Sequence, residues 1–215
     1  MSRLISFEGG DGSGKSTQLK LLSDYLLSHG CACICTREPG GTHLGKMIRK
    51  VLLEVGGQQI SSQTELFLYL ADRAQHVREV IQPALAIGKV VLCDRFTDST
   101  LAYQGYGRGA DLAVLRQMNL IASGGIVPDL TLLLDCSVDL GLSRTVRRME
   151  QQRPAQRRED RFESEQVEFH ERVRRGFREL AQAEPERIHI LDAGRSIQDV
   201  HEQIKRIVEQ KIICD

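Results

Sequence analysis

Residues 7–17 constrain this chain more than any other stretch, because they read Phe-Glu-Gly-Gly-Asp-Gly-Ser-Gly-Lys-Ser-Thr. The run matches the phosphate-binding pattern GxxxxGK[ST] at Gly9, Gly14, Lys15 and Ser16. Apolar residues precede the motif and leucines at helical spacing follow it, which gives the strand, loop and helix that the pattern requires. The sequence therefore predicts a phosphate-binding loop near the N-terminus.

The chemistry of such a loop follows from its residue types. A helix N-terminus offers unpaired backbone N–H groups and the positive end of a dipole, and glycines let phosphates approach the backbone. Lys15 adds positive charge at the β- and γ-phosphates, and the Ser16 hydroxyl can ligate the Mg²⁺ that bridges them. We expect nucleotide phosphates to contact Gly10, Asp11, Gly12, Ser13, Gly14, Lys15, Ser16 and Thr17.

Composition and charge narrow the class of protein. The chain has 215 residues, of which 41% are hydrophobic and 27% charged, and this suits one globular domain over residues 1–215. Lys and Arg together number 29, as do Asp and Glu, so no overall field favours nucleic acid or a membrane surface. The apolar runs are too short to cross a bilayer and the N-terminus does not resemble a signal peptide, so we expect a cytoplasmic protein.

The rest of the chain alternates between apolar runs and helical patterns. After the first strand, further strands are predicted at residues 31–36, 90–94, 130–135 and 188–191. Helices are predicted at residues 18–27, 43–55, 66–75, 111–123, 163–183 and 197–208, with a capping box opening at Ser62 and an interruption at Pro83. This alternation predicts an α/β fold of P-loop NTPase type, with a parallel sheet of about five strands and helices on both faces.

A carboxylate and an arginine follow the predicted strand at residues 90–94. Asp94 ends four apolar residues, as a Walker B acid does, and such an acid can hold magnesium through water. Arg95 then lies at the same end of the sheet as the phosphate loop, where its planar fork suits a phosphate. The alternative, a surface ion pair between the two, is less favoured directly after a buried strand.

Three other segments leave alternatives open from the residues alone. Residues 37–41, Arg-Glu-Pro-Gly-Gly, suit either a ligand loop at a strand end or a plain turn. Tyr69 and Arg73 lie one turn apart and suit either a nucleobase site or, more often for such pairs, the edge of a core. The polar residues between 97 and 105 suit either a pocket lining or a helix cap.

The most basic part of the chain, residues 144–161, contains Pro154 and lies between two predicted helices. We interpret roughly residues 147–162 as a short arginine-rich lid that brings charge to a triphosphate on closure. A nucleic-acid patch is the alternative. It is disfavoured because aromatic residues are not interleaved with the arginines and the chain has no net charge.

Taken together, the motifs resemble those of the thymidylate kinase family, the P-loop enzymes that phosphorylate dTMP. The matching segments are residues 7–17, Arg-Glu-Pro-Gly-Gly at 37–41, Ala-Asp-Arg-Ala-Gln-His at 71–76, Asp-Arg-Phe at 94–96, Ala-Tyr-Gln-Gly at 102–105 and Asp-Arg-Phe-Glu at 160–163. They occur in the family's order and span most of the chain. The resemblance implies ATP as donor, Mg²⁺ as cofactor and no nucleic-acid or membrane partner.

The resemblance also implies an acceptor site for dTMP. Tyr69 would stack on thymine, where many relatives have Phe, and Arg73 and Thr100 would hydrogen-bond the base. Tyr103 would lie under the sugar and disfavour a 2′-hydroxyl. The remaining implied contacts are Arg95, Glu38 and Pro39 at the dTMP phosphate, Asp11 at the sugar 3′-hydroxyl or the magnesium shell, and Ser99 and Gln104 in the same site.

Family members differ in where an additional catalytic arginine lies, either in the phosphate loop or in the lid. Here the loop has none, so the chain resembles the bacterial lid-arginine type, with Arg157 as first choice ahead of Arg153, Arg148 and Arg147. The catalytic set is then Lys15, Arg95 and Arg157, and the magnesium set is Ser16, Asp94 and Glu163. The family further implies a homodimer formed through helices that flank the sheet.

Two rival functions follow from a phosphate loop. One is a kinase of another nucleoside monophosphate. The other is a GTPase-like switch, which would read guanine with an Asn-Lys-x-Asp motif. The chain's single asparagine, Asn119, stands in Gln-Met-Asn-Leu and forms no such motif.

Overall fold

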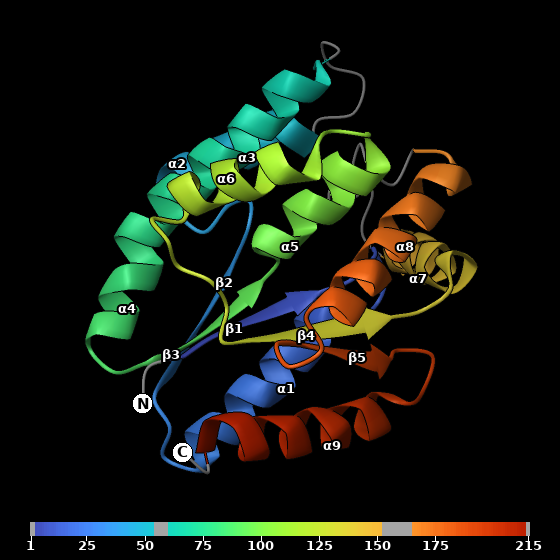
Figure 1. The fold of residues 1–215 in the computed structure, drawn as a ribbon. Helices are drawn as coiled ribbons and strands as arrows, with labels where there is room; N and C mark the ends of the chain where they lie inside the picture. Colours follow the sequence, from blue (N-terminus) through green and yellow to red (C-terminus); the bar gives the residue numbers. More distant parts are fainter. Residues whose placement is uncertain (1–2, 54–59, 152–164, 214–215) are drawn as a thin grey trace.

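The computed structural model describes residues 3–53, 60–151 and 165–213. Its sheet contains five strands, which are β1 (Arg3–Glu8), β2 (Cys33–Arg37), β3 (Val90–Asp94), β4 (Leu130–Asp135) and β5 (Ile188–Asp192). Every pairing is parallel, and the strand order is β2-β3-β1-β4-β5. The predicted parallel α/β sheet of about five strands is therefore confirmed (Figure 1).

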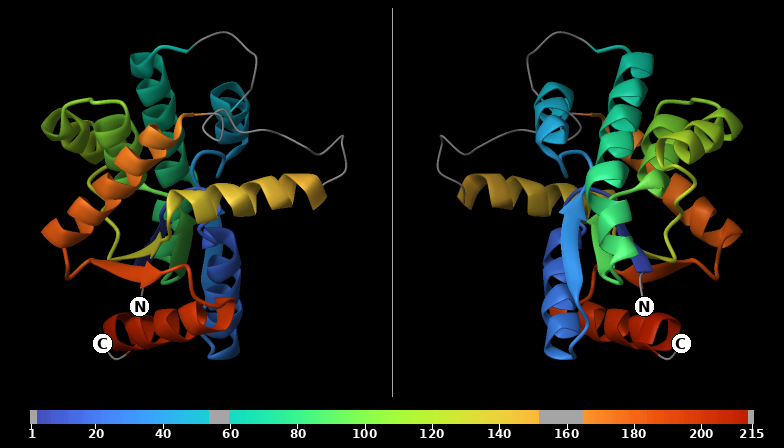
Figure 2. Two further views of the ribbon diagram at one scale, coloured as in Figure 1. Left: turned by 90° about the vertical axis from the view of Figure 1, so that its right-hand side faces the viewer. Right: turned by 90° about the vertical axis from the view of Figure 1, so that its left-hand side faces the viewer.

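The helices connect these strands. They are α1 (Lys15–Ser28), α2 (His43–Leu53), α3 (Ser62–His76), α4 (Gln82–Ala86), α5 (Thr97–Thr100), α6 (Leu112–Ala122), α7 (Val138–Gln151), α8 (Val167–Ala183) and α9 (Ile197–Val208). Three π-helical segments, η1 (Val77–Ile81), η2 (Leu101–Gly107) and η4 (Glu209–Ile213), continue α3, α5 and α9. Helices α1 and α9 cover one face of the sheet, and the others that pack on it cover the opposite face (Figures 1 and 2).

Alternating side chains along the strands build a separate core on each face. Ile5 and Phe7 of β1 point into the core that α1 and α9 complete, whereas Leu4 points into the core beneath η1 and α4. Leu132 and Leu133 of β4 divide in the same way, the latter packing in the core that contains α8 and η2. This period of two explains why the central strands read as continuous apolar runs, since both faces are buried.

Several predicted boundaries are wrong. Pro83 does not interrupt the helical stretch, because the backbone passes through the π-helical segment η1 and places the proline at the start of α4, where no N–H donor is required. The N-cap of α3 is Ser61, whose side chain accepts a hydrogen bond from the Thr64 N–H, and not Ser62. Residues 147–151, the first part of the predicted lid, belong to α7, and residues 152–164 lie outside the described ranges, so the lid stays a prediction.

The register of the sheet aligns the strand ends that carry polar residues. Asp94 of β3 is paired with Phe7 of β1 on one side and with Arg37 of β2 on the other. The loops after β1, β2 and β3 therefore start side by side, at the edge of a parallel sheet where ligands bind. Within the described ranges, no helix combines the length and the apolar character needed to cross a bilayer.

Candidate active site

One large cavity, about 570 Å³ in volume, opens at this edge of the sheet. Of the residues predicted for the site, those that line it are Asp11, Gly12, Ser13, Gly14, Lys15, Ser16, Thr17, Glu38, Pro39, Tyr69, Arg73, Asp94, Arg95, Ser99, Thr100, Tyr103 and Gln104. Gly10 instead lines a much smaller neighbouring cavity. Arg157 and Glu163 lie outside the described residues, as does Arg153.

The phosphate loop forms one wall of the cavity. Its backbone has left-handed torsions that only glycine adopts without strain, with φ of 133° at Gly9 and 70° at Gly12. A Cβ on Gly12 would lie 2.0 Å from the carbonyl oxygen of Gly141 in α7, so this glycine also lets the loop pack directly on that helix. The loop is thus set between β1 and the helix that leads toward residues 152–164.

Lys15 is held under the loop at the start of α1. Its Nζ donates hydrogen bonds to the carbonyl oxygens of Gly9 (3.1 Å) and Gly10 (2.8 Å), and the residue is 8% exposed. Burial, together with the nearby Arg95 cation, lowers the pKa of Lys15 to about 8. The site therefore contains a lysine whose charge the protein compensates poorly, which favours an incoming anion.

Ser16 and Asp94 meet beside the loop. The Ser16 hydroxyl donates to Oδ2 of Asp94 at 2.9 Å, joining the first turn of α1 to the end of β3. A hydroxyl and a carboxylate are hard oxygen ligands of the kind that Mg²⁺ takes alongside waters and phosphates. The chemistry of this pair fits a magnesium ion, which Ser16 and Asp94 would hold beside the phosphate loop.

Arg95 links the phosphate loop to the far side of the cavity. Its Nη2 donates to Oδ1 of Asp11 at 2.7 Å, and its Nη1 donates to the carbonyl oxygen of Gly9 at 3.0 Å. The guanidinium also lies 4.9 Å from the centre of the Tyr103 ring. Burial alone would favour the neutral acid, but the Arg95 and Lys15 cations hold the pKa of Asp11 below its usual value, so this carboxylate stays ionised.

Glu8 is a site residue that the sequence analysis missed. The side chain is fully buried at the end of β1, where its oxygens accept hydrogen bonds from the Phe96 N–H (2.7 Å) and the Ser99 hydroxyl (2.6 Å). Burial, and then the neighbouring Asp98 carboxylate, raise the pKa of Glu8 to about 8. Glu8 fixes the turn that aims Arg95. The sequence pattern that could have indicated Glu8 is an acidic residue at the carboxyl end of a buried strand.

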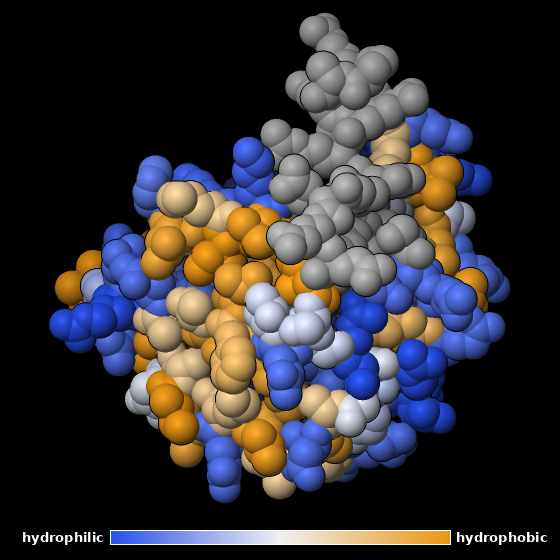
Figure 3. Space-filling model, turned by 90° about the horizontal axis from the view of Figure 1, so that it is seen from above, coloured by the Kyte–Doolittle hydropathy of each residue, from blue (hydrophilic) through white to orange (hydrophobic). Residues whose placement is uncertain are grey.

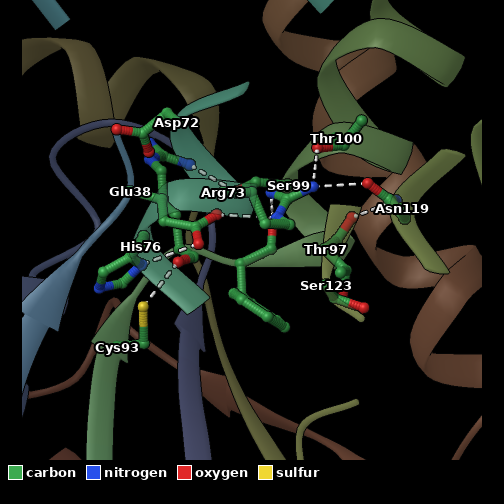
Figure 4. Close-up of polar contacts among 12 residues, drawn as sticks. Glu38, Asp72, Arg73, His76, Cys93, Thr97, Ser99, Thr100, Asn119 and Ser123 are labelled. Carbon is green, nitrogen blue, oxygen red and sulfur yellow. Dashed lines mark hydrogen bonds and ion pairs between the residues drawn. The ribbon is translucent and has the colours of Figure 1, made fainter. Parts of the chain in front are cut away.

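The opposite wall centres on Arg73, from α3 (Figure 4). Its side chain is among the largest fully buried ones, at 1% exposure, and its Nε donates to Oε2 of Glu38 at 2.9 Å. Its Nη1 donates to the Thr100 hydroxyl at 2.9 Å. The guanidinium carbon Cζ lies 5.2 Å from the centre of the Phe96 ring. Arg73 is therefore buried, as the core-edge alternative expects, and it also lines the cavity, so the nucleobase site stays a prediction.

The loop after β2 is tied to α3 by further polar contacts. Nδ1 of His76 lies 2.9 Å from Oε1 of Glu38, and Oδ1 of Asp72 accepts a hydrogen bond from the Gly40 N–H at 3.0 Å. Burial, followed by the nearby Glu38 carboxylate, raises the pKa of Asp72 to about 6. Three polar residues of α3, Asp72, Arg73 and His76, therefore hold the backbone and the glutamate of this loop at the cavity.

The aromatic and amide side chains complete this wall. Tyr69 lines the cavity from α3, and Tyr103 packs edge-on against Phe169, with ring centres 6.1 Å apart. Nε2 of Gln104 donates to Oε1 of Glu65 at 3.0 Å. The polar segment after Arg95 is thus both a pocket lining and, as α5 and η2, helical.

Five arginines that were not predicted as site residues also line the cavity, namely Arg37, Arg49, Arg144, Arg148 and Arg195, although Arg148 was a secondary choice for the lid arginine. Arg49 reaches back from α2 to donate to the carbonyl oxygen of Pro39 at 3.0 Å, and Arg144 donates to the carbonyl oxygen of Ala193 at 2.9 Å. Their concentration around one cavity in a chain without net charge indicates a polyanionic ligand.

A phosphate loop with a strand-end carboxylate on one wall, and a second polar and aromatic wall within the same cavity, define a P-loop phosphotransferase that holds a donor and an acceptor together. Sequence comparison identifies the family. A family model described as thymidylate kinase matches residues 7–204. The chain belongs to the thymidylate kinase family.

Individual relatives agree with this assignment. The thymidylate kinase of Desulfovibrio desulfuricans is 56% identical over 207 residues, which cover 95% of this chain and 94% of that protein. The thymidylate kinase of Synechococcus sp. strain JA-3-3Ab is 51% identical over 210 residues, covering 98% and 97%. The crystal structure of thymidylate kinase from Ehrlichia chaffeensis is similar with a TM-score of 0.76 at 34% identity, covering 96% of this chain and 98% of that one.

Proposed function

We propose that the chain transfers the γ-phosphoryl group of ATP to dTMP, forming ADP and dTDP for the synthesis of dTTP. The single observation that carries this function is one cavity with a phosphate loop on one wall and an aromatic, arginine-bearing wall opposite it. Arg95 contacts both walls, through Asp11 and Tyr103. Membership of the thymidylate kinase family supports dTMP over other acceptors.

The reaction needs positioning and charge neutralisation more than proton transfer. A phosphate oxygen of dTMP is already ionised and attacks the γ-phosphorus directly, while the bond from that phosphorus to the β–γ bridging oxygen breaks. The loop N–H groups and Lys15 would hold the β- and γ-phosphates, and Arg95 would hold the acceptor phosphate in line. Exclusion of water from the closed cavity would limit ATP hydrolysis.

The donor set also accommodates a metal ion. We assign Ser16 and Asp94 to hold Mg²⁺, because their oxygens already lie within hydrogen-bonding distance beside the loop. The ion would neutralise charge on the bridged β- and γ-phosphate oxygens. Glu163 is also proposed to contribute to the magnesium site, and it lies outside the described residues.

For the acceptor, we assign Tyr69 to stack on thymine and Arg73 and Thr100 to bind the base. Tyr103 would lie under the deoxyribose, and Asp11 would bind its 3′-hydroxyl. The Glu38-Pro39 loop, with Arg95, would position the phosphate, and Ser99 and Gln104 support the same wall. The lid arginine remains proposed as Arg157, with Arg148 the one alternative that lines the cavity from a described helix.

A panel of acceptors tests the function directly. In a coupled assay with ATP, dTMP should be turned over far faster than dUMP, dCMP, AMP or GMP. Absence of dTMP turnover would refute the proposal. A clear preference for another acceptor would favour the alternative, a kinase of a different nucleoside monophosphate, and tighter binding of GTP than ATP would favour a switch protein.

The low pKa of Lys15 predicts a pH effect on ATP binding. The ammonium form attracts phosphate, so above its pKa of about 8 the free enzyme must take up a proton to bind ATP. We expect kcat/KM for ATP to be level below that pH and to fall roughly tenfold for each unit above it. Because arginine stays charged, Lys15→Arg should remove this fall. A wild-type profile that stays level well into alkaline pH would contradict the assignment.

The chain is also proposed to form a homodimer in the cytoplasm. Helices α2, α3 and α6 leave large apolar side chains exposed, and in the view from above apolar side chains gather over these helices (Figure 3). The exposed residues are Leu44, Met47, Val51, Phe67, Val114, Leu120 and Ile121. A second copy of the chain is the occupant that the family resemblance implies for this face.

Light scattering tests the dimer. Met47→Glu, which places a charge at a 58% exposed position on α2, should yield a monomer at concentrations where the wild type is dimeric. Leu27→Glu is the matched control, because Leu27 is 55% exposed but lies on α1, on the other side of the sheet. A monomeric wild type, or a Met47→Glu dimer as stable as the control, would contradict this interface.

A further inference from the structure

The guanidinium of Arg73 is almost fully committed to protein partners. A guanidinium carries five N–H donors. Nε donates to Glu38, Nη2 donates to the carbonyl oxygen of Phe96 at 3.0 Å, and the two hydrogens of Nη1 have separate acceptors in Thr100 and Asn119. Within the described residues, one Nη2 hydrogen is thus left for a ligand in the cavity that Arg73 lines.

Asn119 is the least expected of these partners. It comes from α6, it is 4% exposed, and its Oδ1 lies 2.5 Å from Nη1 of Arg73. Its Nδ2 donates to the carbonyl oxygen of Thr97 at 3.2 Å. These two partners fix the orientation of the amide, because a guanidinium only donates and a carbonyl only accepts.

Asn119 lies where it can set the position of residues in the acceptor wall of the cavity. The amide binds the guanidinium on one side and the first residue of α5 on the other, while Thr100 of α5 binds the same Nη1 (Figure 4). The guanidinium of Arg73 therefore cannot change its orientation without breaking a buried charge-assisted hydrogen bond. Asn119 does not line the cavity, so its effect on a ligand must pass through Arg73.

We propose that Asn119 is a positioning residue for base specificity. By occupying Nη1 together with Thr100, it leaves Arg73 with a single, fixed donor toward the base. One donor at one place can donate a hydrogen bond to a carbonyl oxygen of the base but not to an amino group, because two donors would then face each other. The enzyme thereby distinguishes the 4-carbonyl of thymine from the 4-amino group of cytosine. This inference rests on the proposed phosphorylation of dTMP.

The test compares kcat/KM for dTMP with kcat/KM for dCMP. Asn119→Ala frees Nη1 and lets Arg73 turn, so the preference for dTMP over dCMP should fall about tenfold, mainly through a higher KM for dTMP. Asn119→Asp keeps an acceptor for Nη1 and should retain the preference within about threefold of wild type. Arg116→Gln is the control, since Arg116 lies on α6 with Asn119 but its side chain is 48% exposed and pairs with Glu184 at the end of α8, away from Arg73.

The outcomes separate positioning from structural support. If Asn119→Ala lowers kcat/KM for both acceptors equally, or if Asn119→Asp loses as much discrimination as Asn119→Ala, the inference is overturned. Should Asn119→Ala not give folded protein, Asn119→Ser is measured with the same expectation, since serine is too short to reach Nη1 directly. A wild-type chain that does not phosphorylate dTMP would refute the proposed function instead, without bearing on the contacts of Asn119.

Discussion

Replacing Lys15 with methionine is expected to lower kcat for dTMP phosphorylation by roughly two to three orders of magnitude, because a single preorganised donor at developing charge is worth about 3–4 kcal/mol. The ammonium group lies within 3.1 Å of two loop carbonyl oxygens, so its position is set before ATP arrives. Methionine retains the length of the stem but provides neither charge nor donor. The loss should appear in turnover at saturating ATP, since the proposed role of Lys15 is to stabilise charge on the γ-phosphate during transfer.

The stability of the same variant should separate function from folding. Burial, with Arg95 nearby, lowers the pKa of Lys15, which means that the fold itself disfavours the charge on this side chain. We therefore expect Lys15→Met to melt within a few degrees of the wild type. Lys20→Met on the same helix is the control, because Lys20 is 79% exposed in an ion pair with Asp24. A Lys15→Met enzyme within a few fold of the control would remove Lys15 from the mechanism.

The sequence predicts the central part of this fold best. The limits of β3 and β4 are as predicted, because both strands are buried on both faces and consist almost entirely of apolar residues before the acid that ends them. The edge strand β2 was placed two residues too early at its N-terminal end, since it is only partly buried and its cysteines and alanine carry a weaker pattern. The predicted interruption at Pro83 was wrong for a different reason. The π-helical segment before this proline is defined by backbone hydrogen bonds, which the residue types do not reveal.

The site was predictable where a local motif or the family resemblance encodes it. The phosphate loop and Asp94 were predicted from short sequence patterns. Tyr69 and Thr100 were predicted from the family resemblance, and both line the cavity. What the sequence did not provide are residues whose role depends on distant partners. Asn119 meets Arg73 across 46 positions, and Glu8 meets the Phe96 N–H across 88. Such pairs depend on how α3, α6 and the strand ends are packed, which no local spacing encodes.

Arg95 connects the two walls of the cavity, because its side chain contacts both Asp11 and Tyr103. It has a φ of 71°, a conformation that costs a non-glycine residue about 1 kcal/mol or more. The strain is compensated by its hydrogen bonds to Gly9, Asp11 and Ser99, and the turn is fixed by Glu8 through the Phe96 N–H. A backbone strained in this way directs the side chain from the end of β3 back across the phosphate loop.

We therefore expect Arg95→Gly to lower kcat/KM for dTMP by about a thousandfold, through loss of the acceptor-phosphate contact and of the alignment of Asp11. Arg95→Lys should recover less than about a tenth of the activity, because an ammonium cannot bond Gly9, Asp11 and a phosphate with one planar fork. Arg95→Gly should also melt no lower than Arg95→Ala, since glycine relieves the left-handed conformation that alanine retains. Steady-state kinetics and thermal unfolding measure both effects, with the exposed Arg175→Ala as control. A lysine variant close to wild type would mean that Arg95 contributes only charge, and the geometric role argued here would be wrong.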